Sequence, residues 1–316
     1  MRYIKDIKDG EQLNGIYYCK EKKELRSKND KPYYSMTLQD KTGSLDAKVW
    51  DTNSNGIEDF TGGDFVCVQG QVSIYMGALQ GKIIRARRCG EGEYDLADYI
   101  PTSRYDRDEM YGKLLDIIDT VKNPYYKKLL DAFFRDKEFA EKFKNHSAAK
   151  TVHHSFVGGL LEHSLGVVKV CDFMSNQYPM INRDLLITAA PLHDIGKMVE
   201  LSGFPTNEYT DSGQLLGHIY IGANMINEKI NSIENFPKRL ADELIHCILS
   251  HHGSLEFGSP KMPALMEAFA LSLADNMDAK METFTELLEV NEGRTDWLGY
   301  NKFFESNIRI ATKNKE

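Results

Sequence analysis

The sequence has few features of a secreted or membrane protein. No stretch reaches the run of about 18 apolar residues that a membrane-spanning helix needs, and residues 1–6 lack the apolar segment of a secretory signal. The five cysteines are scattered and never form a CxxC pair, which argues against a disulfide framework and against a structural zinc knot. We therefore expect a soluble, cytoplasmic protein with reduced thiols and no membrane partner.

Histidine is absent before residue 146 and after residue 252. Most of the nine histidines form an ordered series with two aspartates, which comprises His163, His193, Asp194, His218, His251, His252 and Asp275. Imidazole and carboxylate groups are ligands that divalent transition metals accept. Because the series spans so much of the chain, its members can meet only in a folded domain. The series therefore predicts a metal site that a whole domain assembles.

The N-terminal part has the pattern of β-structure. Tyr34, Met36 and Leu38 alternate with polar residues, residues 40–43 have turn chemistry, and alternation resumes in residues 45–49. Further β runs cover residues 13–20, 65–75 and 82–88. About five strands in this length predict a small all-β barrel of the OB type over residues 1–90, with another type of small barrel as the alternative.

The period then becomes helical, so the sequence predicts a multidomain protein in which an all-α domain follows the barrel. Residues 91–107 combine glycine, proline and mixed charge without periodicity, and we predict a linker there. Apolar residues recur at helical spacing from Met110 onward, so we assign residues 108–300 to the helical domain. Residues 301–316 are predicted to be a C-terminal tail.

Two neighbours in the series suggest catalytic chemistry. Adjacent helical residues point about 100° apart, so His193 and Asp194 can approach one metal from two sides, or Asp194 can bridge two metals. Lys197 lies on a neighbouring face, where its ammonium could meet a phosphate that the metal holds. We predict catalytic roles for Asp194 and Lys197. The single histidines His146 and His246 are interpreted as structural, whereas His153 and His154 could line the site without binding metal.

These residues resemble a known enzyme superfamily. His163, His193-Asp194 and Asp275 match the H...HD...D signature of HD-domain phosphohydrolases, and His218 with His251-His252 matches the additional ligands of its two-metal members. Residues 153–163, 192–197, 250–253, 256–261 and 275–280 are similar to the YhaM-type 3′-to-5′ exoribonucleases, which pair an OB-fold with an HD domain. The resemblance covers nearly the whole chain but is weak after residue 290.

The resemblance implies an enzyme that removes nucleotides from the 3′ end of single-stranded RNA, with single-stranded DNA as a second candidate substrate. It also implies two divalent ions, for which we expect Mn²⁺, with Co²⁺, Fe²⁺ and Mg²⁺ as alternatives. We assign His163, His193, Asp194 and Asp275 to the first ion. The second would be held by Asp194 as a bridge with His218, His251 and His252, while Lys197 would stabilise the phosphoryl oxygens.

Other functions remain open at this point. A phosphodiesterase for cyclic dinucleotides shares the ligand series, but no Gly-Tyr-Pro stretch follows Lys197. A phosphohydrolase that acts on free nucleotides would not need a barrel. A nucleic-acid-binding protein without catalytic activity is a third alternative, against which the full ligand series argues. The sequence leaves the oligomeric state open.

The predicted barrel has residues suited to single-stranded nucleic acid. Residues 1–90 have 15 Lys/Arg and 12 Asp/Glu, a net charge of +3, while the rest has −11, although ordinary surface variation could also produce this difference. Aromatic rings stack on bases and basic side chains bind phosphates. We predict nucleic-acid contacts from Tyr33, Trp50, Lys48, Lys82, Arg85, Arg87 and Arg88. Tyr17, Tyr18, Tyr34 and Tyr75 are further stacking candidates, although alternation places Tyr34 inside.

Overall fold

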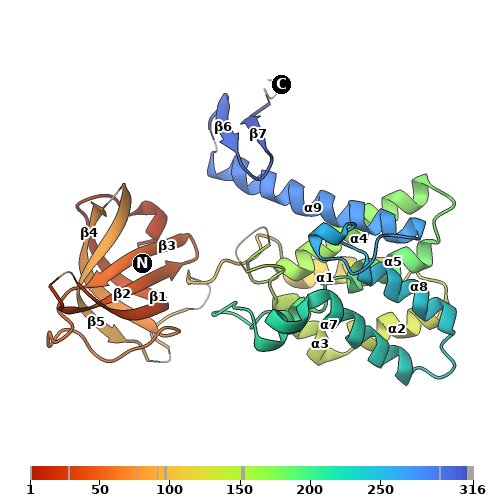
Figure 1. Ribbon diagram of the computed structural model, residues 1–316, viewed down its shortest axis with the longest axis horizontal. Helices are drawn as coiled ribbons and strands as arrows, with labels where there is room; N and C mark the ends of the chain where they lie inside the picture. Colours follow the sequence, from red (N-terminus) through yellow and green to blue (C-terminus); the bar gives the residue numbers. More distant parts are fainter. Residues whose placement is uncertain are drawn as a thin grey trace. The chain divides into compact units, whose positions relative to one another are not determined.

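The computed structural model describes residues 2–27, 29–75, 77–90, 92–95, 98–150, 154–291 and 293–311. The chain divides into two compact units. The first contains the residues up to Asp106 and two later segments, Phe156–Gly158 and Leu201–Tyr209. The second contains Arg107–Ser155, Gly159–Glu200 and the residues from Thr210 onward. Figure 1 shows strands in the first unit and mainly helices in the second, which confirms the predicted fold class.

The strands of the first unit close into a barrel. These strands are β1 (Gln12–Arg26), β2 (Pro32–Asp40), β3 (Gly43–Val49), β4 (Phe65–Tyr75) and β5 (Ala78–Arg88), preceded by the short 3-10 helix η1 (Ile4–Asp6). Their order around the barrel is β1-β2-β3-β5-β4, and β3 pairs with β5 in parallel. This order, with antiparallel pairing elsewhere, is that of an OB-type barrel.

Alternation along the strands places the barrel core. Met36 pairs with Ala47 and Leu38 with Leu45 across β2 and β3, and all four side chains are buried. The residues between them face outward, because successive side chains of a strand point to opposite sides. Tyr17 and Tyr18 are both only 1% exposed. Neither can stack on a base from inside the protein, which removes both from the predicted stacking candidates.

The segment after β5 differs from the predicted linker. Tyr94 stacks on Phe65 with ring centroids 3.8 Å apart, and Tyr99 and Ile100 are buried in the same cluster. Phe204, from one of the two later segments, also packs against this cluster. The described residues of 91–106 therefore belong to the barrel unit. Their apolar side chains are too irregularly spaced to produce a periodic pattern.

The second unit is helical. Its helices are α1 (Arg107–Ile118), α2 (Pro124–Phe134), α3 (Lys137–Asn145), α4 (Gly159–Gln177), α5 (Arg183–Leu192), α6 (Lys197–Glu200), α7 (Asp211–Ser232), α8 (Lys238–Leu249) and α9 (Met266–Val290), with the 3-10 helix η3 (Leu255–Phe257) before α9. Leu185 and the residues after it in α5 are all buried, so α5 lies in the core. Within the described ranges, no helix combines the length and the apolar character needed to cross a membrane.

A β-hairpin follows α9. Its strands, β6 (Trp297–Asn301) and β7 (Ser306–Arg309), are antiparallel. Figure 1 shows the hairpin at the C-terminal end of α9. The predicted boundary at residues 300 and 301 falls inside this hairpin, so the described residues 301–309 are folded rather than a tail. Most hairpin side chains are exposed and do not alternate, which explains why no strand was predicted here.

Candidate metal centre

The described helical unit brings the whole predicted ligand series together. His163 lies in α4, His193 and Asp194 directly follow α5, His218 lies in α7, and Asp275 lies in α9. His251 and His252 follow α8 by one residue, Ser250. The ligands therefore come from five separate parts of the helical fold, two of which supply an adjacent pair. The rigid packing of these helices fixes their positions.

The side chains of the predicted series form two groups of potential ligands, and a third group, His154, His163 and Asp278, shares His163 with the first. In the first, His163, His193 and Asp275 place one ligand atom each within 4.8 Å of the others. His163 Nε2 is 3.2 Å from both His193 Nε2 and Asp275 Oδ1. The second group consists of His218, His251 and His252, which meet the same distance criterion. Each group has enough donors for one cation.

Asp194 lies between the two groups. Its Oδ2 is 3.5 Å from His163 Nε2 and 3.3 Å from His193 Nε2. Its Oδ1 faces the second group, 3.5 Å from His218 Nε2 and 3.6 Å from His251 Nε2. A carboxylate placed in this way can offer one oxygen to each of two cations.

Hydrogen bonds fix the orientation of the imidazole rings. Backbone carbonyls lie next to three Nδ1 atoms: Ala190 O is 2.7 Å from His193, Ile248 O is 2.7 Å from His251, and Phe257 O is 2.8 Å from His252. A carbonyl oxygen can only accept, so each of these Nδ1 atoms donates a proton. The Nε2 lone pair of each ring is then available to a metal, which is the tautomer that metal-binding histidines adopt.

The ends of two helices produce this arrangement locally. The last carbonyls of an α-helix have no partner within the helix. His193 and His251 each follow a helix closely and use the free carbonyl three residues earlier. Imidazoles just beyond a helix end thus satisfy the backbone and present Nε2 to the site.

Two glycines allow α6 and α7 to bring His218 to Asp194. A Cβ atom on Gly196 would lie 2.0 Å from the carbonyl oxygen of His218 and 2.7 Å from the nitrogen of Gly222. Gly217 interrupts α7 with a φ of 72°, a conformation that glycine adopts without steric cost. The chain can therefore turn sharply just before His218 and pass directly against the segment that follows Asp194.

The centre holds buried polar atoms that lack partners. Asp194 Oδ1, His218 Nε2 and His251 Nε2 are buried and form no hydrogen bond with any described residue. Such atoms are rare because each costs free energy unless a partner satisfies it. These orphaned atoms converge on one region, and the donors are all imidazole and carboxylate groups. The site therefore fits divalent transition metals, whose cations would satisfy these atoms.

Charges in the centre compensate one another strongly. Burial alone would raise the pKa of Asp194, but Lys197 and His193 hold it well below its usual range. Burial would likewise lower the pKa of His163, yet hydrogen bonds to Asp275 and Asp278 raise it to about 10. These carboxylates therefore favour the protonated form of the His163 ring. A metal ion at this position would replace its proton.

Lys197 lies closer to Asp194 than the sequence suggested. We expected its ammonium to face a phosphate, whereas its Nζ is 2.6 Å from Asp194 Oδ2. Burial tends to lower the pKa of Lys197, but the Asp194 charge outweighs this effect and raises it. The side chain still lines the pocket next to the centre. Its ammonium is charged and available on that side.

Two carboxylates outside the predicted ligand series orient ligands. Asp278 Oδ2 is 2.8 Å from His163 Nδ1 and 3.1 Å from His154 Nε2. Glu200 Oε1 is 3.1 Å from His218 Nδ1. Asp278 lies one helical turn after Asp275, and this spacing is the sequence signal that could have identified it. Glu200 has no comparable signal, because α6 and α7 are brought together only by the fold.

The other histidines have different surroundings. His146 Nδ1 lies 3.0 Å from Ser147 O, and His246 Nε2 accepts a hydrogen bond from Ala264 N at 2.9 Å. Both histidines thus contact backbone atoms, which fits the structural role that we predicted for them. His154 contacts Asp278 and lies next to the His163 ring, with ring centroids 5.3 Å apart, and His153 lies outside the described residues.

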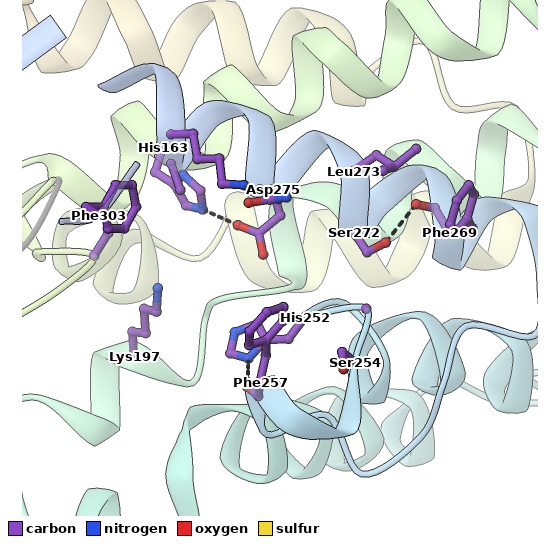
Figure 2. Close-up of a pocket in the computed structure, with 15 residues that line it drawn as sticks. His163, Lys197, His252, Ser254, Phe257, Phe269, Ser272, Leu273, Asp275 and Phe303 are labelled. Atoms are coloured by element: carbon purple, nitrogen blue, oxygen red, sulfur yellow. Dashed lines mark hydrogen bonds and ion pairs between the residues drawn. The ribbon is translucent and has the colours of Figure 1, made fainter. Parts of the chain in front are cut away.

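A pocket of about 440 Å³ opens next to the centre. His163, Lys197, His252 and Asp275 form part of its wall. Figure 2 shows Phe303 and Phe269 on opposite sides of the pocket, with Asp275 between them. The pocket therefore combines an ion-binding wall with exposed aromatic rings.

The outer face of the barrel contains several of the predicted nucleic-acid contacts. Tyr33 and Trp50 stack on each other with ring centroids 4.7 Å apart, and Trp50 is 48% exposed. Lys48 and Lys82 are paired in register on β3 and β5. An aromatic pair and two ammonium groups thus lie on neighbouring strands of the barrel.

The basic residues of the barrel differ in whether they already form an ion pair with an acidic side chain. Lys48 pairs with Asp46, Arg87 binds Glu93 with two nitrogens, and Arg88 pairs with Asp64. Lys82 and Arg85 are exposed and form no ion pair within the part of the chain that the structure describes. A ligand would reach Lys82 and Arg85 without breaking an existing ion pair.

Comparisons with known proteins agree with this architecture. The HD domain family profile matches residues 160–280. The 3′-5′ exoribonuclease YhaM of a Geobacillus species is 35% identical over 281 residues, 89% of this chain and 86% of that protein. The protein of the same name from Bacillus velezensis is 35% identical over 283 residues, 89% of this chain and 88% of that protein.

Among solved structures, the second OB-fold domain of replication protein A from Methanococcus maripaludis matches 30% of this chain and 98% of that domain, at 20% identity and a TM-score of 0.22. The OB assignment rests instead on the strand order of the barrel itself. The chain combines a barrel with a helical domain that contains the HD match, and its relatives are similar to it over most of their length. The chain therefore belongs to the YhaM family of 3′-5′ exoribonucleases.

Proposed function

We propose that this protein is a 3′-to-5′ exoribonuclease that hydrolyses single-stranded RNA with two divalent ions, and that single-stranded DNA is a second substrate. The main support is the position of Asp194, whose two oxygens face two separate histidine groups. The family relationship supports the direction and the substrate, because the relatives are named 3′-5′ exoribonucleases.

We assign His163, His193 and Asp275 to one ion and His218, His251 and His252 to the other, with Asp194 shared. The two groups of neighbouring ligand atoms support this partition. We expect Mn²⁺ at both positions, with Co²⁺, Fe²⁺ and Mg²⁺ as alternatives. When bound, such ions activate a water molecule and neutralise charge on a phosphodiester. Asp278 and Glu200 keep the His163 and His218 rings oriented for this purpose.

Lys197 completes the proposed catalytic wall. Its raised pKa keeps the ammonium charged at neutral pH, and the side chain lines the pocket next to Asp194. A fixed positive charge at this position stabilises the additional negative charge that phosphoryl oxygens acquire during in-line attack. We therefore assign transition-state stabilisation to Lys197.

The barrel is proposed to hold the RNA strand. The Tyr33–Trp50 pair offers a stacking surface, and Lys48, Lys82, Arg85, Arg87 and Arg88 offer phosphate contacts. Its OB strand order supports this role, because such barrels bind oligonucleotides on their strand 2–3 face. Five free cysteines fit the reducing cytoplasm, where we place the activity.

One experiment tests the proposal directly. The full-length protein is loaded with Mn²⁺ and incubated with a 5′-labelled single-stranded RNA of about 20 nucleotides, which exceeds the roughly 4–16 nucleotides that one OB-type barrel engages. We expect a ladder of labelled products that shorten from the 3′ end. A cyclic dinucleotide and a free nucleotide serve as competing substrates. Hydrolysis of either one without any RNA ladder would refute the exoribonuclease proposal in favour of another phosphohydrolase.

A further inference from the structure

The pocket next to the metal centre has an apolar side that the proposed ligand set does not use. Phe257, Phe269 and Phe303 line it, and each side chain is more than half exposed. Exposed aromatic rings that converge in one pocket form a surface on which a planar ligand can stack. Resting on the proposed function, we infer that this pocket binds the 3′-terminal nucleotide of the RNA, with its base stacked on Phe303.

The hairpin turn is built to present Phe303. Asn301 Oδ1 accepts hydrogen bonds from the backbone nitrogens of Phe303 and Phe304, which fixes the turn between β6 and β7. Phe304 then packs against Phe284 of α9, with ring centroids 4.3 Å apart. Phe303 meets Phe304 edge to face, at 5.0 Å and 90°, and remains exposed at 51%. Phe304 thus anchors the turn, and Phe303 lines the pocket, where Figure 2 shows it.

The polar side of the pocket suits the rest of a nucleotide. Asn276 and Lys280 lie one helical turn apart on α9, and both line the pocket. An amide can hydrogen-bond to ribose hydroxyls, and an ammonium can bind a phosphate. The volume of about 440 Å³ falls within the range of small-molecule sites, so it accepts one nucleotide.

The chemistry of the reaction requires such a position. Water forms a new bond to the phosphorus, the bond from phosphorus to the 3′-oxygen of the preceding nucleotide breaks, and that oxygen takes up a proton. The phosphate therefore leaves with the terminal nucleotide as a nucleoside 5′-monophosphate. A ligand with its phosphate at the ion-binding wall extends its base into the adjoining space, which is the aromatic pocket. Nucleoside 5′-monophosphates thus bind this pocket as products.

Calorimetric binding of 5′-AMP to the full-length, Mn²⁺-loaded protein tests the assignment. We expect Phe303→Ala to weaken 5′-AMP binding by about tenfold, the order expected when one stacked base is lost. Tyr300→Ala removes an exposed ring of the same hairpin that does not line the pocket, and we expect unchanged affinity. Inorganic phosphate, which has no base, is expected to bind wild type and Phe303→Ala equally. That result also shows that the variant keeps an intact centre.

RNA kinetics separate the two proposals. In Phe303→Ala, we expect the KM for single-stranded RNA to rise while metal content stays the same. If wild type shortens RNA but Phe303→Ala binds 5′-AMP as tightly as wild type does, the pocket assignment is wrong and the exoribonuclease proposal stands. If wild type fails to shorten RNA, the proposed function is wrong, whatever the result for 5′-AMP.

Discussion

Asp194 is the side chain that joins the two histidine groups, since each of its oxygens faces a different one. Asp194→Ala removes a ligand from both groups at once. We expect hydrolysis of RNA to fall by at least about 10²-fold, the scale of losing one preorganised catalytic group. Metal content, measured by mass spectrometry after chelation and reloading, is expected to fall at the same time.

The matched control for this variant is Asp242→Ala, which removes an exposed carboxylate on α8. It is expected to keep wild-type activity and metal content. Wild-type hydrolysis by well-folded Asp194→Ala would contradict the shared-ligand role of Asp194.

Lys197 pairs with the Asp194 carboxylate and also lines the pocket. A variant distinguishes whether its role is to support Asp194 or to act on the substrate. We expect Lys197→Ala to lower kcat by on the order of 10²-fold while metal content is unchanged, because it removes a charge that acts on the substrate. Lys238→Ala, which removes an exposed ammonium on α8, is the control. Loss of bound metal together with kcat would instead identify Lys197 as a support for Asp194.

At the scale of elements, the close approach of α6 and α7 depends on Gly196. Gly196→Ala places a methyl group 2.0 Å from the His218 carbonyl oxygen, so α7 must move away. Overpacking of this kind destabilises a protein by about 1–3 kcal/mol. We expect a lower thermal midpoint and weaker metal binding, both measured on the purified variant. Gly112→Ala, at a site with open space on α1, is expected to leave metal binding unchanged and to raise the thermal midpoint slightly, because alanine favours a helix more than glycine does.

The elements of both units differ in how well the sequence predicts them. The strands were predictable because Met36 and Leu38 alternate with polar residues, and the ligand series was predictable because histidines and aspartates recur in order along the predicted helical domain. Glu200 was not predictable, because its partner His218 lies in another helix that only the tertiary structure brings near. Tyr94 and Tyr99 were assigned to a linker, since single aromatic residues at irregular spacing leave no periodic signal.

For the whole molecule, the barrel is predicted to set affinity for long strands and the centre to set turnover. Trp50→Ala in the full-length protein removes half of the Tyr33–Trp50 pair. We expect KM for RNA of about 20 nucleotides to rise by about tenfold with kcat unchanged, since one stacked base is worth roughly 1–3 kcal/mol. Tyr178→Ala, an exposed ring of the helical unit, is the control. Equal KM values for all three proteins would show that this face does not bind RNA.

The path of the chain limits how this protein can be divided. The boundary between the units is crossed after Asp106, Ser155, Gly158, Glu200 and Tyr209. A gene fragment that encodes only the first 106 residues would lack Val157 and Phe204, which pack against the apolar cluster of the barrel unit. Recombination at a single breakpoint after Asp106 would therefore leave this cluster without two of the side chains that pack on it. We expect the two units to be inherited together, so that gene fusions gain or lose the pair as one block.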